Sequence, residues 1–167
     1  MIILGIDPGL ATVGWGVIES VRGAQRPIAF GAITTPAHTL IESRLAMIES
    51  DLTEIINKYK PDEMAVEELF FNTNITTGIA VAEARGVILC TAYKLGVKIA
   101  EYTPLQVKQA VVGYGKAEKQ QVIAMVTSIL RLPAPPKPDD TADAVAIALC
   151  HAQCTGSGMG KYFNKRS

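Results

Sequence analysis

Cysteine is scarce in this chain of 167 residues, with three copies, at Cys90, Cys150 and Cys154. An odd number without regular spacing argues against a small fold held together by disulfides. Cys150 and Cys154 flank His151 in a predicted helix, so a zinc site shared with Cys90 is one interpretation. We favour the other, in which the cysteines are small buried hydrophobic groups.

Long apolar runs are also missing, because none reaches the roughly 18 residues that a membrane-spanning helix needs. The apolar start at residues 1–6 is too short for a secretory signal and has no basic residue before it. Hydrophobic residues still make up 49% of the chain, which is typical of a globular protein with a real core. We predict a cytoplasmic protein with one domain at 1–154 and a flexible tail, rich in Gly and Ser, at 155–167.

An excess of one charge is missing as well, since 16 Lys and Arg residues balance 16 Asp and Glu residues. The net charge therefore gives no support to a nucleic-acid-binding function. Local charge does, because only Glu101 and Glu118 oppose the basic residues between positions 85 and 119. These are Arg85, Lys94, Lys98, Lys108, Lys116 and Lys119, and the tail adds Lys161, Lys165 and Arg166. Such a face favours a phosphate polymer as ligand, with an ordinary solvated surface as the alternative.

The hydrophobic pattern at the start of the chain predicts an antiparallel meander. Strands are expected at 1–7, 12–20 and 28–34, with a turn over 22–27. In the second strand, Gly14 and Gly16 share one face, which leaves room for another element to approach closely.

From residue 39 onward the pattern alternates between helix and strand. It predicts helices at 39–60, 76–95, 103–112, 117–130 and 139–153, and strands at 64–67 and 97–100. The expected fold is α/β, with a five-stranded mixed sheet flanked by helices on both faces. This order of elements matches the ribonuclease-H-like fold.

Carboxylates stand where that fold would bring them together. Asp7 and Glu67 each end a strand that is otherwise apolar, where an ionised group is costly unless a cation compensates it. Asp140 and Asp143 are three apart at the start of the last helix and share a face. Since the first and fourth strands are neighbours in a ribonuclease-H-like sheet, we expect the four carboxylates to converge.

Converging carboxylates suit hard divalent cations such as Mg²⁺ or Mn²⁺. Two such ions about 4 Å apart could activate a water molecule and stabilise the leaving oxygen of a phosphodiester. Two simpler interpretations stay open: Asp7-Pro8-Gly9 as a plain turn, and Asp139, Asp140 and Asp143 as the usual acidic first turn of a helix. The pattern does not choose between Glu67 and Glu68, or between Asp139 and Asp140.

Several segments resemble motifs of the RuvC family of Holliday junction (crossover junction) endodeoxyribonucleases. They are Ile3-Leu4-Gly5-Ile6-Asp7-Pro8-Gly9, Ala65-Val66-Glu67-Glu68-Leu69-Phe70, Val107-Lys108-Gln109-Ala110-Val111-Val112-Gly113, Ala117-Glu118-Lys119 and Asp140-Thr141-Ala142-Asp143-Ala144-Val145-Ala146-Ile147-Ala148. The resemblance extends from residue 1 to about residue 151, with the motifs in the order and spacing of the family.

The resemblance implies a Mg²⁺-dependent nuclease, with Mn²⁺ able to substitute, that nicks four-way DNA junctions symmetrically and leaves 5′-phosphate and 3′-hydroxyl ends. The implied catalytic metal ligands are Asp7, Glu67, Asp140 and Asp143, so the family register selects Glu67 and Asp140 from their pairs. Whether Glu68 or Asp139 assists stays open.

The resemblance also implies DNA contacts and protein partners. Lys108 and Lys119 match DNA-contacting positions, and Lys116 lies in the same basic segment. Phe70 matches an aromatic position that stacks on an unpaired base, with Phe71 as the alternative ring. The implied partners are a second copy of the chain and the branch-migration motor RuvA–RuvB.

Symmetric cuts need two like sites, which favours a homodimer. The helix at 76–95, rich in Ala and Gly, is the candidate interface, with tight packing inside one subunit as the alternative.

Rival functions are a related nuclease acting on RNA, a phosphotransferase of the actin-like and sugar-kinase class, and a junction-binding module without activity. The second needs two lobes and exceeds this length, and the intact carboxylate set disfavours the third.

Overall fold

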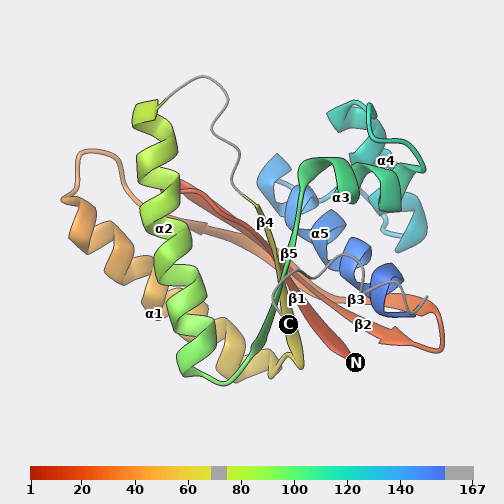
Figure 1. The fold of residues 1–167 in the computed structure, drawn as a ribbon, viewed down its shortest axis with the longest axis horizontal. Helices are drawn as coiled ribbons and strands as arrows, with labels where there is room; N and C mark the ends of the chain where they lie inside the picture. The colour runs from red at the N-terminus through yellow and green to blue at the C-terminus, as the bar shows by residue number, and fades with distance from the viewer. Residues whose placement is uncertain (69–74, 157–167) are drawn as a thin grey trace.

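A computed structural model describes residues 1–68 and 75–156 (Figure 1). Its five-stranded sheet has the order β3-β2-β1-β4-β5. Antiparallel pairs join β1 to β2 and β2 to β3, while β4 lies parallel to both β1 and β5. The strands are β1 (Ile2–Asp7), β2 (Thr12–Val21), β3 (Ala24–Thr34), β4 (Glu63–Glu67) and β5 (Lys98–Tyr102). The predicted mixed sheet with an antiparallel start is confirmed.

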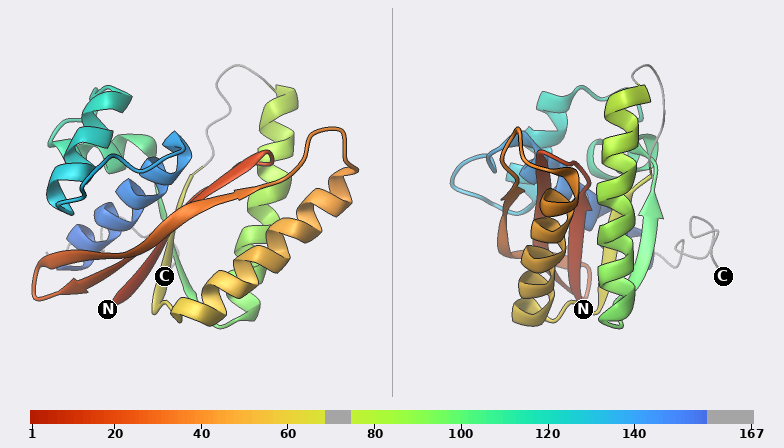
Figure 2. Two further views of the ribbon diagram at one scale, coloured as in Figure 1. Left: turned by 180° about the vertical axis from the view of Figure 1, so that it is seen from behind. Right: turned by 90° about the vertical axis from the view of Figure 1, so that its left-hand side faces the viewer.

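Helices cover both faces of the sheet, as predicted (Figures 1 and 2). On one face, α1 and α2 close a core that contains Leu4, Val17 and Met64 of the strands. On the other face, α3, α4 and α5 close a second core around Ile3, Ala65 and Tyr102. The helices are α1 (Ile41–Tyr59), α2 (Ile75–Lys94), α3 (Pro104–Val112), α4 (Lys119–Ile129) and α5 (Asp139–Gly156).

The hairpin between β2 and β3 is longer than its sequence pattern predicts. A turn was expected over 22–27, but only Arg22 and Gly23 form it, with φ angles of 50° and 84°. Positive φ at both central residues is the geometry of a two-residue hairpin loop, and it matches the twist of the strands. Pro27 is compatible with a strand here because β3 is an edge strand and its missing N–H breaks no inner ladder.

The glycine face of β1 and β2 receives α5, as predicted from Gly14 and Gly16. A Cβ atom on Gly16 would lie 2.5 Å from Cγ2 of Val145, and one on Gly14 would collide with the backbone carbonyl of Asp140. On β1, a Cβ atom on Gly5 would collide with the carbonyl of Ala144. The absence of side chains at these positions therefore lets the backbone of α5 lie directly on the sheet.

The starting points of α3 and α4 determine where Lys108 and Lys119 lie. Thr103 caps α3, accepting a hydrogen bond from the Gln106 amide at 3.2 Å, and the Gln106 side chain accepts one from the Thr103 amide at 2.8 Å. This confirms the predicted cap, with Pro104 at the first helical position. Helix α4 begins at Lys119, two residues after its predicted start.

The cysteines lie on opposite sides of the sheet, so they cannot share a zinc ion. Cys150 and Cys154 are buried in α5, which confirms the hydrophobic interpretation for them. Cys90 is exposed on α2, so its predicted burial is wrong.

The first two residues of the predicted tail, Thr155 and Gly156, belong to α5. The rest of the predicted tail lies outside the described residues. Within residues 1–68 and 75–156, none of the helices combines the length and hydropathy that a bilayer crossing requires.

The contact between Gly5 and α5 can be tested by Gly5→Ala. The added methyl group has backbone atoms as neighbours, with the Ala148 amide nitrogen at 2.8 Å, so a side-chain rotation cannot relieve the clash. We expect a loss of about 1–3 kcal/mol in the free energy of unfolding, measured by urea denaturation. Gly156→Ala is the control, since its Cβ atom would meet nothing within 4 Å. Equal stability of the two variants would contradict the close packing.

Candidate active site

Two carboxylates stand side by side at the end of the sheet because β1 and β4 are parallel neighbours. Asp7 is the last residue of β1, and Glu67 is the last residue of β4. The register pairs Ile6 with Val66, so the two acidic residues follow at the same level. Glu67 points to the α5 side of the sheet, as Ala65 does two residues earlier.

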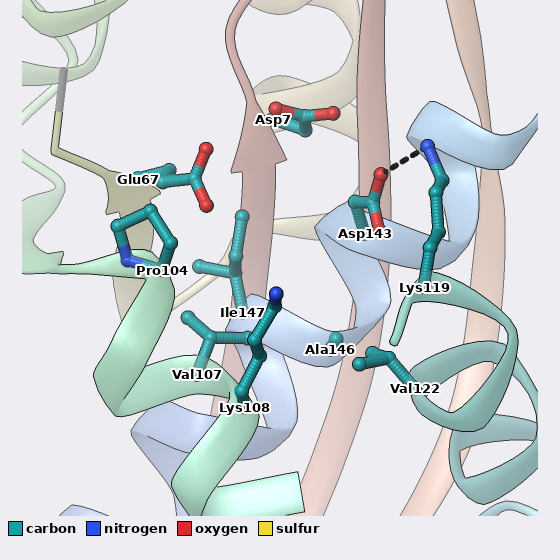
Figure 3. Close-up of a pocket in the computed structure, with 10 residues that line it drawn as sticks. All are labelled: Asp7, Glu67, Pro104, Val107, Lys108, Lys119, Val122, Asp143, Ala146 and Ile147. Carbon is teal, nitrogen blue, oxygen red and sulfur yellow. Dashed lines mark ion pairs between the residues drawn. The ribbon is translucent and has the colours of Figure 1, made fainter. Parts of the chain in front are cut away.

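Helix α5 adds the third carboxylate, that of Asp143. The first turn of this helix lies against Gly14 of β2, and its following turns cross Gly16 and Gly5. Asp143 is therefore held over the ends of β1 and β4 by the same glycine contacts that seat the helix. Figure 3 shows Asp7, Glu67 and Asp143 around a common space.

That space is a cavity of about 230 Å³ with an acidic floor and two lysines at its rim (Figure 3). Lys108 comes from α3, and Lys119 is the first residue of α4. Apolar side chains form the remaining wall. The lining residues are Asp7, Glu67, Pro104, Val107, Lys108, Lys119, Val122, Asp143, Ala146 and Ile147.

The two carboxylates at the strand ends resist ionisation. Burial, followed by the charges of Glu67, Asp143 and Asp140, raises the pKa of Asp7 from 3.8 to about 8, against an opposing effect of Lys119. Burial and the charge of Asp143 raise the pKa of Glu67 from 4.5 to about 7, although Lys108 and Lys119 lower it. Such a concentration of negative charge is characteristic of a site that binds a cation or moves a proton.

Lys119 supplies part of the positive charge. Its Nζ atom lies 2.9 Å from Oδ2 of Asp143 and 3.7 Å from Oδ2 of Asp139. Burial opposes protonation of Lys119, but the hydrogen bond and charge of Asp143 outweigh it, so the pKa of Lys119 is raised.

The chemistry of the donors fits a hard divalent cation, because the cavity offers only carboxylate oxygens as ligands beside open space. In the described part of the chain, however, no group of three Asp, Glu, His or Cys side chains is close enough together to hold a metal ion. The carboxylate oxygens and the negative charge thus support a metal site. The protein side chains alone, however, do not surround an ion there.

The structure separates the residues that the sequence left as alternatives. Glu67 lines the cavity and Glu68 does not. Asp140 and Asp139 are both outside the lining, but the charge of Asp140 acts on Asp7 while Asp139 faces Lys119. Asp140 is therefore less directly placed than Asp7, Glu67 and Asp143.

Of the predicted DNA-contacting residues, some line the cavity and others do not. Lys108 and Lys119 line the cavity, whereas Lys116 is exposed in the loop between α3 and α4 and does not. Phe70 and Phe71 lie outside the described residues.

Two polar contacts, one of them at the Glu67 strand end, had no signal in the sequence pattern. Arg85 of α2 pairs with Glu101 and donates a hydrogen bond to the backbone carbonyl of Glu67. On the other face, His151 joins Tyr102 to Glu63 through hydrogen bonds of 2.8 and 2.7 Å. Each contact joins residues distant along the chain, so local periodicity carries no trace of them.

Comparison with known proteins places this site in a family. A family model described as crossover junction endodeoxyribonuclease RuvC matches residues 3–151. A curated RuvC from Rubrobacter xylanophilus is 52% identical over 164 residues, covering 96% of this chain and 92% of that protein. One from Heliobacterium modesticaldum is 57% identical over 159 residues, covering 95% and 98%.

Solved structures agree with the sequence comparison. Thermus thermophilus RuvC has a TM-score of 0.87 at 36% identity, covering 95% of this chain and 97% of that one. The same protein in complex with Holliday junction substrate has a TM-score of 0.89 at 37% identity, covering 95% and 96%. The yeast mitochondrial Holliday junction resolvase Ydc2, at 14% identity, has a TM-score of 0.68 and shows the fold alone, covering 96% and 80%.

The sheet order, the helices on both faces and the acidic strand ends define a nuclease with the ribonuclease-H-like fold. More specifically, the chain belongs to the RuvC family of crossover junction endodeoxyribonucleases. Enzymes of this family depend on a divalent metal ion.

The raised pKa values predict how stability depends on pH in the metal-free protein. Because the pKa of Asp7 rises from 3.8 to about 8 on folding, the folded state binds more protons than the unfolded state between these values. Asp7 therefore lowers the free energy of unfolding as pH rises from about 4 to about 8. We expect Tm to fall over this range in EDTA, and Asp7→Asn to flatten the fall.

Calorimetric scans from pH 4 to pH 8 would measure this effect. Asp51→Asn, a change on the exposed surface of α1, is the control and should leave the pH dependence as in the unchanged protein. An Asp7→Asn profile as steep as that of the control would show that Asp7 is not the destabilising group.

Proposed function

We propose that this chain resolves four-way DNA junctions by cutting two strands at symmetric positions. The observation that carries the proposal is the cavity in which Asp7, Glu67 and Asp143 meet Lys108 and Lys119. Carboxylates for a metal ion and lysines for phosphate are what hydrolysis of a phosphodiester requires. The structural relative from Thermus thermophilus, solved with a Holliday junction substrate, supports a junction as the DNA ligand.

In this proposal Asp7, Glu67, Asp140 and Asp143 are the catalytic residues that hold Mg²⁺, two ions per subunit, with Mn²⁺ able to substitute. Bound ions would activate the attacking water and stabilise the leaving oxygen, giving 5′-phosphate and 3′-hydroxyl ends. The rigid strand ends orient Asp7 and Glu67, while α5 orients Asp143.

Lys108 and Lys119 bind the DNA backbone next to the scissile phosphate. Both stand at the rim of the cavity, Lys108 in the second turn of α3 and Lys119 at the start of α4. Lys116, exposed between these helices, extends the basic surface and contacts phosphate farther from the cut. Val107, Val122 and Ile147 form an apolar wall that limits the access of water from the side of the hydrophobic core.

Phe70 and Phe71 stand three and four residues after Glu67 in the sequence. We assign to Phe70, with Phe71 as the alternative, stacking on a base that the junction leaves unpaired. A ring next to the acidic strand end would place the scissile phosphate relative to the junction centre.

Homodimerisation through α2 completes the proposal. One face of this helix packs inside the subunit through Ala84, Ile88 and Ala92. The opposite face exposes Ile79 by 54% and Tyr93 by 80%. Between these two lie Glu83, Gly86 and Cys90, all exposed and spaced by three or four residues. An exposed stripe of this kind, with Gly86 open to close approach, supports contact with a second copy.

The biological setting follows from the same function. Resolution takes place during recombination and repair, in the cytoplasm, where we propose that the RuvA–RuvB motor delivers the junction. Residues 157–167, which include Lys161, Lys165 and Arg166, lie outside the described residues, and we assign them no further role.

Incubation with labelled junction, linear duplex and RNA–DNA hybrid, each with Mg²⁺ or EDTA, tests the substrate. We expect cleavage only of the junction and only with Mg²⁺, because paired sites need a two-fold substrate. Asp7→Asn should bind the junction as tightly as the unchanged protein but cut it at least about 10²-fold more slowly, since it loses a metal ligand. Cleavage of the hybrid in place of the junction would favour the related nucleases that act on RNA.

The dimer face can be tested by Ile79→Glu, measured by light scattering after size exclusion. A charge on the exposed stripe of α2 should convert the dimer to a monomer and abolish paired cutting. The matched control is Ile28→Glu, since Ile28 on β3 is 45% exposed and lies away from α2. If both variants remain dimeric, α2 is not the interface.

A further inference from the structure

Arg85 joins three elements beneath the active site. It comes from α2, and its Nη2 atom lies 2.6 Å from Oε2 of Glu101 on β5. Its Nε atom donates a hydrogen bond of 3.1 Å to the backbone carbonyl of Glu67, the last residue of β4. The Arg85 and Glu101 side chains are 14% and 15% exposed, so water competes little for these contacts.

The carbonyl of Glu67 needs this donor because the strand ladder cannot supply one. Met1 exchanges both backbone hydrogen bonds with Ser20 of β2, so the odd-numbered residues of β1 face β2. The even-numbered residues of β1 therefore turn their backbone groups toward β4. In the register of the two strands, the amide opposite the Glu67 carbonyl belongs to residue 8. Residue 8 is proline and has no N–H.

We propose that Arg85 is a positioning residue that replaces the missing Pro8 amide and holds the Glu67 peptide in place for metal binding. This inference deepens the proposed function and rests on the assignment of Glu67 as a metal ligand. The contact fixes the strand end from the α2 side of the sheet. It leaves the carboxylate of Glu67 free on the α5 side, where the cavity lies.

The ion pair with Glu101 holds Arg85 in this position. Glu101 is the register partner of Val66, the residue before Glu67, so the pair lies directly beneath the strand end. The same guanidinium group connects α2, the proposed dimer helix, to the end of β4 that carries the Glu67 carboxylate. Removing Arg85 alone would leave a buried carboxylate and destabilise the whole fold.

The test therefore compares two variants that both lose the ion pair. Glu101→Gln keeps Arg85 and its hydrogen bond to Glu67, whereas Arg85→Gln combined with Glu101→Gln lacks the guanidinium. The first readout is the affinity for Mn²⁺, measured by calorimetry on DNA-free protein below the Tm of both variants. We expect affinity about 10-fold weaker in the double variant than in Glu101→Gln. The second readout is amide hydrogen exchange of residues 63–68 in EDTA, which should be faster in the double variant alone.

Equal Mn²⁺ affinity and equal exchange in the two variants would overturn the role of Arg85. An equally large loss in Glu101→Gln would also overturn it, because the ion pair would then be the cause. If the double variant does not fold, Arg85→Lys replaces it, since lysine keeps the charge but not the planar fork that reaches two acceptors. If the unchanged protein binds no Mn²⁺, the proposed function fails, and the exchange readout still decides the inference.

Discussion

The close contact between α5 and the glycine face of β1 and β2 is the constraint on which the site depends. Gly5, Gly14 and Gly16 let helix backbone lie where side chains would otherwise separate the layers. With any larger residue there, α5 would rise from the sheet and carry Asp143 away from the strand ends. A packing requirement in the core thus determines the spacing of the carboxylates, and the chemistry follows from it.

That arrangement has an electrostatic cost, which the surrounding residues offset only in part. Burial and mutual repulsion raise the pKa values of Asp7 and Glu67, and Lys119 and Lys108 oppose the rise. The clustered carboxylates therefore lower the free energy of unfolding when they are ionised. Enzymes of this family depend on a divalent ion, and an ion held by the proposed ligands would supply the compensation that the lysines alone do not.

The sheet divides the molecule into two working faces. On one face, helices α3, α4 and α5 carry the two lysines and the carboxylate of Asp143; on the other face, α2, which lies beside α1, provides the surface proposed for dimerisation. Arg85 links the two faces from the α2 side, since it donates a hydrogen bond to the backbone carbonyl of Glu67, whose carboxylate lies on the α5 side. A single buried side chain therefore connects the geometry of the cutting site to the helix that would join two subunits.

The sequence by itself determined the order of elements, the mixed sheet and the candidate carboxylates, because periodicity and strand-end acids are local features. It missed the full length of β3, because Gly23 and Pro27 are residues typical of a longer turn. It also missed the exposure of Cys90. Only the tertiary structure decided that Glu67 lines the cavity while Asp140 stands outside it, and that Arg85 serves the Glu67 carbonyl. These facts depend on which strands become neighbours, and pairing across dozens of residues leaves no periodic trace in the chain.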